Sequence, residues 1–277
     1  MTDDPLQQGT PPGSLRHFAV IYAAERARPL LMALYAYEAA IAETVQASSH
    51  EVAHTRLHWW RGEIDRLLGG HPQHPVTRAL EPLREFAGER LSLLHEPLVA
   101  ADIDLAQLAL ENARQLEAYC FRASGSLQTL AAHASSGDAS LSEGELDFAR
   151  RLGSAVRRTE LLRDLRRHLA SGRLPLPLDA LKHAGIDPQS VHPDTMTPAF
   201  GAVLLAMRDE LRRELRQLPD ALDRTSRTRQ RHGLVLAALH ARLLARIEPI
   251  GDLGRTRAEV PGWAKLWTAW RTALRAA

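Results

Sequence analysis

A row of acidic and basic side chains in the middle of the chain has the spacing needed to act together. Glu160, Asp164 and His168 recur every four residues, which places them on one face of a helix. Arginines surround this row, namely Arg157, Arg163, Arg167 and Arg173. Such a row is more often an intrahelical salt-bridge ladder than a site. As a site, the arginines would suit an anion, because guanidinium groups pair well with phosphate.

Two adjacent tryptophans, Trp59 and Trp60, are the second feature that could do chemistry. Indole rings can stabilise a cation, but tryptophans are more often packing anchors. The histidines between positions 58 and 74 lack the spacing of metal ligands on one helix face, so no zinc site is expected there. The single cysteine, Cys120, excludes an intrachain disulfide and fits a reducing setting.

Helices must position these residues, since the composition favours helix throughout. Alanine, leucine and arginine abound, aromatic residues make up 5% of the 277 residues, and β-branched runs are scarce. Apolar residues recur at helical spacing over 29–47. A capping box of Ser142 and Glu145 begins a helix expected to reach about residue 170. A long apolar segment, 105–134, is predicted to be one central helix. The sequence therefore predicts an all-α bundle.

The first residues differ in composition from the rest of the chain. They are polar and contain Pro11, Pro12 and Gly13, so we expect a flexible N-terminal leader over 1–14. No repeat or domain boundary follows, and one helical domain is expected over 15–277. The leader lacks the basic start and apolar core of a signal peptide, and no apolar run approaches the roughly 20 residues needed to cross a bilayer. A cytoplasmic protein is expected, with peripheral contact at a membrane surface left open.

The charge balance bears on the kind of partner. The chain has 35 Lys and Arg against 33 Asp and Glu, a formal net charge of +2. A nucleic-acid binder would concentrate unmatched basic residues on one face. No nucleic-acid partner is therefore expected.

Three stretches resemble the squalene/phytoene synthase family. Residues 28–37 read RPLLMALYAY and resemble the helix that leads into the family's first aspartate motif. Residues 57–67 read LHWWRGEIDRL and precede HPQHPV at 71–76, which resembles the family's paired tryptophan and the start of its next helix. Residues 161–164 read LLRD and precede GRLPLP at 172–177, which resembles the second aspartate motif and its flap. The matches cover nearly the whole chain in the family's order.

The resemblance implies both a fold and a chemistry. The fold is a single-domain helical bundle of the isoprenoid-synthase (class I terpenoid synthase) type, and family enzymes join two prenyl diphosphates head to head. Aspartates on two facing helices hold magnesium, which binds the diphosphate and stabilises it as it leaves. An apolar cavity shields the carbocation from water. The aromatic residues assigned to the cavity or its packing are Tyr35, Tyr37, Trp59, Trp60 and Tyr119.

The first aspartate motif departs from the family pattern. The resemblance puts its acidic residues at Ala42, Glu43 and Gln46, of which only Glu43 is acidic. The arginine that precedes the motif in the family is Ala39 here. This helix therefore keeps one carboxylate of its motif.

The second motif departs from the pattern in a different way. Asp164 is kept, with Glu160 in place of the family's asparagine, but the acidic pair that should follow is Arg167 and His168. A guanidinium repels a metal ion nearby, by about 4 kcal/mol at roughly 4 Å and an intermediate effective dielectric. The remnants of the metal site are thus Glu43, Glu160 and Asp164. No cofactor is expected, with magnesium bound by Glu43 and Asp164 only if this reduced site is active.

Three functions stay open at this point. The first is a squalene/phytoene synthase-like protein that keeps the fold and binds a prenyl diphosphate or another isoprenoid, with transferase activity lost. The second is an active prenyltransferase of isoprenoid biosynthesis with the reduced metal site. The third is a non-catalytic assembly factor for a respiratory complex, with a protein partner. It would resemble the branch that includes the mitochondrial assembly factor for NADH:ubiquinone oxidoreductase, whose members also lack the full aspartate motifs.

Overall fold

The computed structural model describes residues 5–47, 49–137, 139–194, 197–247 and 257–276, which contain helices and no β-strand. The all-α prediction is confirmed. The α-helices are α1 (Leu15–Ile21), α2 (Arg28–Val45), α3 (His50–Leu68), α4 (Pro75–Leu80), α5 (Leu83–Ala87), α6 (Glu96–Leu105), α7 (Ala113–Cys120), α8 (Ser126–Ser136), α9 (Glu143–Arg163), α10 (Leu165–Ala170), α11 (Leu178–His183), α12 (Pro198–Gln217), α13 (Arg224–Arg229), α14 (Arg231–Leu244) and α15 (Gly262–Arg275). Short 3-10 helices lie at Pro5–Gln7, Glu25–Ala27, Gly88–His95, Pro188–Ser190 and Leu218–Ala221.

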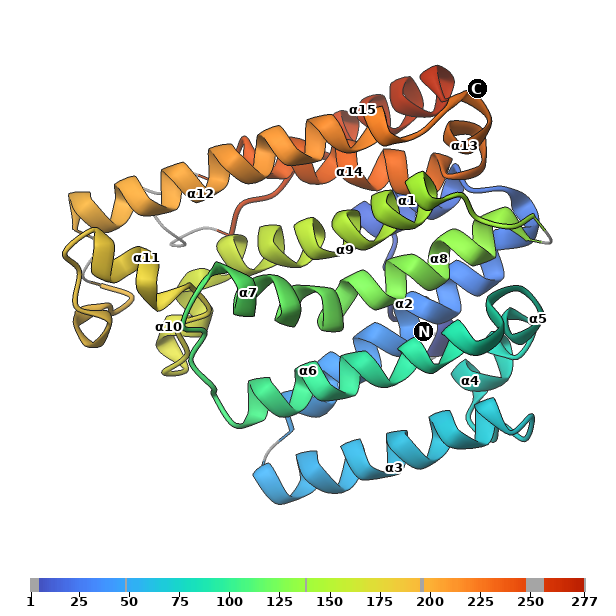
Figure 1. Cartoon of the computed structure of the whole chain (residues 1–277), viewed down its shortest axis with the longest axis horizontal. Coiled ribbons are helices and arrows are strands. Elements are labelled where there is room, and N and C mark those ends of the chain that lie inside the picture. Colours follow the sequence, from blue (N-terminus) through green and yellow to red (C-terminus); the bar gives the residue numbers. More distant parts are fainter. Residues whose placement is uncertain (1–4, 48, 138, 195–196, 248–256, 277) are drawn as a thin grey trace.

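Most of the longer helices run along the long axis of the molecule and stack in layers (Figure 1). α3 forms one edge, α12 and α15 form the other, and α2, α8 and α9 lie between them. One hydrophobic core packs α2 to α6 against α8, and a second packs α9 and α10 against α12, α14 and α15. No helix within the described ranges is long and apolar enough to cross a membrane.

Side-chain caps set where several helices begin. The capping box expected at Ser142 and Glu145 is confirmed: Ser142 Oγ accepts a hydrogen bond from the Glu145 N–H at 3.2 Å, and the Glu145 carboxylate accepts from the Ser142 N–H at 3.0 Å. α2 begins one residue before Pro29, which fits a first helical turn because its missing N–H has no partner there. Ser49 caps α3 by accepting from the Val52 N–H.

The prediction of one long helix over 105–134 is wrong. α6 ends at Leu105, α7 begins only at Ala113, and a π-helical turn separates α7 from α8. In the connection between α6 and α7, the Leu110 carbonyl accepts a hydrogen bond from the Leu178 N–H at 2.9 Å. A tertiary partner therefore takes a carbonyl group that a continuous helix would use, which local periodicity does not register.

The π-helical turn, Phe121–Gly125, lets α7 and α8 approach α9 closely. A Cβ on Gly153 of α9 would lie 2.5 Å from the Cα of Gly125, so neither position has room for a larger residue. One turn beyond Gly153, Arg157 donates a hydrogen bond to the Tyr119 hydroxyl at 3.2 Å. The close approach thus fixes Arg157 against α7.

The helix predicted from the Ser142 cap to about residue 170 is interrupted at Asp164. This residue has φ −101° and ψ 14° and separates α9 from α10. Its carboxylate accepts hydrogen bonds from Arg257, which lies 93 residues later in the chain. The pattern of neighbouring residues contains no information about such a distant partner.

Part of the segment predicted as a leader, 1–14, packs against the helices. Thr10 is 5% exposed, and a Cβ on Gly9 would lie 2.0 Å from the Tyr35 carbonyl carbon. Ser14 caps α1 by accepting from the His17 N–H at 3.1 Å. Residues 1–4 lie outside the described residues, and the domain boundary at residue 15 stays a prediction.

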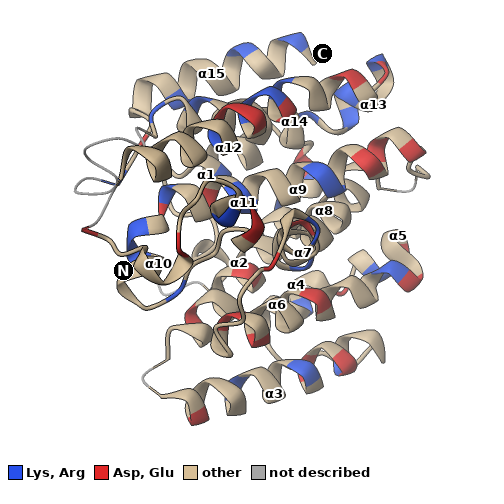
Figure 2. Ribbon diagram, turned by 60° about the vertical axis from the view of Figure 1, so that its left-hand side comes forward, with Lys and Arg blue, Asp and Glu red and all other residues tan. Residues whose placement is uncertain are grey.

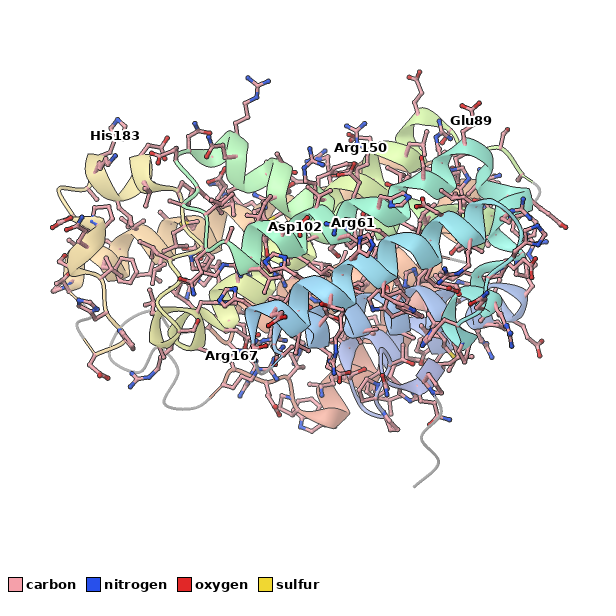
Figure 3. All side chains as sticks on the ribbon, turned by 90° about the horizontal axis from the view of Figure 1, so that it is seen from below. Arg61, Glu89, Asp102, Arg150, Arg167 and His183 are labelled. Carbon is pink, nitrogen blue, oxygen red and sulfur yellow. The ribbon has the colours of Figure 1, made fainter. Side chains whose placement is uncertain are left out.

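The stretch that resembles the family's paired-tryptophan region forms a joint between α3 and α4. Glu63 is fully buried and accepts hydrogen bonds from the Gln73 and His74 N–H groups at 2.8 and 2.7 Å. Burial disfavours the ionised carboxylate, but these bonds outweigh it and lower the pKa of Glu63 to about 2. On the side of α3 that faces α6, Arg61 binds Asp102 (Figure 3). The motif therefore holds α3 in place.

Candidate functional site

A cavity of about 610 Å³ lies between α2 and α6 on one side and α9 and α10 on the other. Its apolar lining comes from α2, α6 and the π-helical turn, and its larger members are Ile41, Val45, Pro97 and Leu105. Its charged lining consists of six arginines and four carboxylates: Arg16, Arg157, Arg163, Arg167, Arg173, Arg257, Glu38, Asp104, Glu160 and Asp164. The size is within the usual range for a small-molecule site.

The first motif helix presents little charge to this cavity. Ala39, Ala42 and Gln46 line it, whereas Glu43 is exposed and is not among the lining residues. Glu38, one helical turn before Ala42, is the only acid that α2 contributes. The α2 wall is therefore mostly neutral where the family pattern has aspartates.

Arg16 of α1 links the two motif helices. Its guanidinium lies 2.9 Å from Glu38 Oε1 of α2 and 3.2 Å from Glu160 Oε1 of α9. The three side chains are between 13% and 18% exposed. Glu160 also lies 3.8 Å from Arg157. A row of alternating charges thus runs from α2 to α9 through a residue of α1.

The two carboxylates that share Arg16 ionise differently. Burial raises the pKa of Glu38, and the opposing charge of Arg16 does not cancel this effect. Its second oxygen is buried without a hydrogen-bond partner among the described residues. Burial also disfavours the ionised form of Glu160, but Arg16 and Arg157 outweigh it and lower the pKa of Glu160. Glu38 is therefore the more readily protonated member of the pair.

Asp104 of α6 is held by two of the arginines predicted from the sequence. Its carboxylate binds Arg173, lies 3.4 Å from Arg157, and accepts a hydrogen bond from the Tyr119 hydroxyl at 3.1 Å. The guanidinium carbons of Arg157 and Arg173 lie 5.4 and 5.3 Å from the centre of the Tyr119 ring. Asp104 is thereby engaged by cations and a hydroxyl donor.

Asp164 is the most strongly paired carboxylate of the cavity. It accepts hydrogen bonds from Arg163 at 2.6 Å and from Arg257 at 2.8 Å, and Arg167 lies 3.8 Å away. Burial opposes its ionisation, but the bonds from Arg163 and Arg257 hold the pKa of Asp164 well below its usual value. Asp164 is ionised at neutral pH, with its charge compensated by arginines.

His168 lies on α10 beside this group. Burial, together with the positive charges of Arg173 and Arg157, lowers the pKa of His168 to about 4. The imidazole is therefore neutral at neutral pH, and it adds no charge to the cavity.

Most of the charged residues predicted as a site do come together. Glu160, Asp164 and the four arginines Arg157, Arg163, Arg167 and Arg173 all line the cavity, and Glu43 does not. The salt-bridge ladder is only part of the arrangement, because the shortest partners of Glu160 and Asp164 include Arg16 and Arg257 from other elements. Arg167 lies toward the end of the molecule where α3 begins, with 65% of its side chain exposed (Figure 3).

Four charged lining residues were missed by the sequence reasoning: Arg16, Glu38, Asp104 and Arg257. One of them left a usable signal, since Glu38 precedes Ala42 by four residues and so shares its helix face. The other three lie on elements that no sequence motif connects to the aspartate motifs.

The five aromatic residues assigned to the cavity or its packing are not among the lining residues. Tyr35, Tyr37, Trp60 and Tyr119 are buried, and Trp59 is 45% exposed. The Tyr35 hydroxyl hydrogen-bonds His232 at 2.6 Å, and Tyr37 packs edge-on against Trp60. Four of the five therefore pack in the interior, outside the cavity wall.

The donor set fits a magnesium cluster poorly. Magnesium requires several oxygen ligands in near-octahedral geometry. Each carboxylate of the cavity already lies against one or more arginines, and no group of three potential ligands converges within the described ranges. The positions that should supply further acids are Ala42, Gln46, Arg167 and His168. The residues present do not match the requirements of this metal.

Comparison with known proteins identifies a family and relatives with similar sequences. Residues 13–264 match the family described as squalene/phytoene synthase. A phytoene synthase of Thermus thermophilus is 27% identical over 218 residues, which cover 75% of this chain and 70% of that protein. A presqualene diphosphate synthase of Sinorhizobium fredii is 30% identical over 173 residues, which cover 59% of this chain and 58% of that protein.

Solved structures show the same fold at lower sequence identity. A crystal structure of a dehydrosqualene synthase in complex with a ligand superposes with a TM-score of 0.72, at 16% identity, over 98% of this chain and 99% of that one. A squalene synthase from Alicyclobacillus acidocaldarius superposes with a TM-score of 0.60, at 18% identity, over 82% of this chain and 88% of that one. At these identities the likeness concerns the fold.

Proposed function

The chain belongs to the squalene/phytoene synthase family, and on this premise we propose that its cavity binds an isoprenoid with an anionic head without magnesium. The ligand class is a prenyl diphosphate or a related isoprenoid phosphate. The transferase reaction of the family, which begins with metal-assisted loss of diphosphate, is proposed to be lost.

The observation that carries this proposal is the charge of the cavity. Six arginines face four carboxylates there, and burial favours protonation of one of the four, Glu38. The excess positive charge suits an anion and opposes a divalent cation. Arg167 and Arg257 have the most exposed guanidinium side chains of the set, at 65% and 54%. They are the best placed to turn from Asp164 to an incoming phosphate.

The apolar lining supports the other half of the ligand. Ile41, Val45, Pro97 and Leu105 offer a surface on which a prenyl chain would be removed from water. No polar side chain of α2 beyond Glu38 and Gln46 interrupts this surface within the described residues. An amphiphilic ligand would therefore lie with its head toward α9 and α10 and its chain along α2 and α6.

The test is calorimetric titration with a non-reactive farnesyl diphosphate analogue, in a chelating buffer and again with magnesium. We expect binding in both buffers with similar affinity. Arg167→Gln combined with Arg257→Gln should weaken binding by about tenfold or more, because each loses a charged hydrogen bond. Arg213→Gln, an exposed arginine of α12 that does not line the cavity, is the matched control and should bind as the parent does.

Two other outcomes would replace the proposal. Binding that requires magnesium, together with turnover of a prenyl diphosphate, would indicate an active prenyltransferase with a reduced metal site. The cavity-facing carboxylates Glu160 and Asp164 favour this alternative. Absence of binding in both buffers would indicate a non-catalytic interaction factor with a protein partner, in the cytoplasm or at a membrane.

A further inference from the structure

α15 has an unusual distribution of side chains. Its large apolar residues recur at spacings of three and four, which places them on one face. They are Trp263, Leu266, Trp267, Trp270 and Leu274, and each is between 44% and 70% exposed. The opposite face, which packs against α14, carries the buried alanines Ala264, Ala269 and Ala273. The helix therefore buries its small residues and exposes its large apolar ones.

This exposed face is continuous. The rings of Trp267 and Trp270 lie with their centres 5.1 Å apart, and Leu266 and Leu274 lie within one turn on either side of them. α15 runs along one edge of the molecule, so the whole row can meet a flat surface at the same depth (Figure 1). Contiguous exposed apolar groups of this kind mark an interaction surface.

The charges beside this face are positive. α15 contains Lys265, Arg271 and Arg275 and no Asp or Glu, so Figure 2 shows blue but no red along it. Arg271 and Arg275 are exposed, and Arg242 of α14 lies with its guanidinium 5.9 Å from the centre of the Trp263 ring. The surface thus combines tryptophan, leucine and arginine, with no acidic residue of its own.

We propose that α15 is a membrane-surface anchor that lies in the headgroup region of a bilayer containing anionic lipids. Tryptophan prefers the boundary between lipid headgroups and acyl chains, because its ring is apolar and its N–H is polar. The leucines would enter the acyl boundary, and Arg271 and Arg275 would meet lipid phosphates. This contact is independent of the occupant of the cavity.

A second copy of the chain fits the same face less well. A symmetric pairing of two α15 faces would bring the arginines of both copies to one interface. Neither helix has an acid to neutralise them, and like charges across an interface are repulsive. A bilayer with anionic headgroups supplies both the apolar layer and the negative charge.

The test is co-sedimentation of the full chain with vesicles of phosphatidylcholine alone or mixed with phosphatidylglycerol. We expect tighter binding to the mixed vesicles, weakened by salt. Trp267→Ala with Trp270→Ala should weaken binding to mixed vesicles by about tenfold for each tryptophan. Arg271→Gln with Arg275→Gln should weaken it by about fivefold for each arginine and reduce the preference for anionic lipid.

Trp59→Ala is the matched control, because Trp59 is 45% exposed on α3 at the opposite edge of the molecule. It should bind vesicles as the parent does, and all variants should keep the parental circular dichroism because they alter outward-facing side chains. The proposal is overturned if the parent binds neither kind of vesicle, or if Trp59→Ala weakens binding as much as the α15 variants. A parent that is dimeric without lipid, beside a monomeric Trp267 and Trp270 variant, would assign the face to a second copy instead.

Discussion

The two stretches that match the family's aspartate motifs differ from the family pattern in two different ways. On α2 the cavity-facing positions Ala42 and Gln46 carry no charge, and the remaining acid, Glu43, is exposed. On α9 and α10 the carboxylates of Glu160 and Asp164 remain in the cavity. The motif positions of α2 that face the cavity therefore have no carboxylate, whereas Glu160 and Asp164 keep carboxylates that arginines already bind.

This difference teaches that counting acids does not measure the capacity to bind a metal. Asp164 is buried, ionised and inside the cavity, which are properties of a ligand, yet Arg163 and Arg257 donate to its two oxygens. Metal binding there would have to displace charged hydrogen bonds as well as overcome repulsion. The second motif therefore keeps its aspartate, but arginines compensate the charge of that aspartate.

The largest effect is expected from removing the arginine that joins the two motif helices. Arg16→Ala leaves Glu38 and Glu160 without their shared partner, and breaking a buried ion pair costs about 3–5 kcal/mol. The free energy of unfolding, measured by urea denaturation, should fall by that amount. Arg213→Ala, at an exposed position of α12, should change it little.

A second variant distinguishes the loss of a partner from the loss of a side chain. Arg16→Leu with Glu38→Gln and Glu160→Gln removes all three charges, so most of the stability should return. If Arg16→Ala unfolds at the same urea concentration as the parent, the bridge between α2 and α9 does not stabilise the fold.

The next prediction tests whether acids must be restored on both α2 and α10 to obtain a metal site. Ala42→Asp, Gln46→Asp, Arg167→Glu and His168→Asp together restore acids on both sides of the cavity. This variant should be less stable than the parent without metal, because clustered carboxylates repel one another. At 100 times its Kd, magnesium should add about 2.7 kcal/mol to the stability of this variant and so raise its melting temperature. The melting temperature of the parent should not change.

The two halves of that variant are its controls. Ala42→Asp with Gln46→Asp alone should respond weakly to magnesium because Arg167 remains. Arg167→Glu with His168→Asp alone should also respond weakly because the α2 positions stay neutral. Equal melting temperatures with and without magnesium in the fourfold variant would show that the two motif helices do not converge on a common site.

A smaller effect is expected in the pH dependence of stability. The folded pKa of His168 is about 4, below its ordinary value of 6.5. Between these values the unfolded chain binds a proton that the folded chain does not, so the stability that neutral His168 permits is lost as pH falls from 6.5 toward 4. The free energy of unfolding is measured by urea denaturation at several pH values. In His168→Gln its decline with falling pH should be shallower, by a slope that corresponds to at most one bound proton. Gln46→Ala, which removes no titrating group from α2, should keep the parental slope.

The smallest effect is expected at Glu43. Its side chain is exposed and does not line the cavity, so Glu43→Gln should leave the melting temperature and the affinity for the diphosphate analogue unchanged. Asp164→Asn is the comparison, since it removes the negative charge and one of the two acceptor oxygens that Arg163 and Arg257 share and should lower stability. A loss of affinity for Glu43→Gln would restore this residue to the site.

The sequence alone determined the helical class, many helix positions and six of the ten charged residues that line the cavity. Periodicity and caps are local, so the start of α2 to within one residue and the capping box at Ser142 could be predicted from neighbouring residues. The same locality placed Glu160 and Asp164 on a common helix face near four arginines. Glu38 was within reach of this reasoning, one turn before Ala42.

Only the tertiary structure decided which charges meet. Arg16 reaches Glu160 across 144 positions and Arg257 reaches Asp164 across 93, and no local pattern records such pairs. The same holds for the carbonyl of Leu110, which lies between α6 and α7, where one central helix was predicted, and accepts a hydrogen bond from the distant Leu178 N–H. It also holds for α15, where packing against α14 selects the alanine face for burial and leaves the larger apolar residues exposed. Helix formation depends on neighbours in sequence, whereas charge pairing and the choice of buried face depend on neighbours in space.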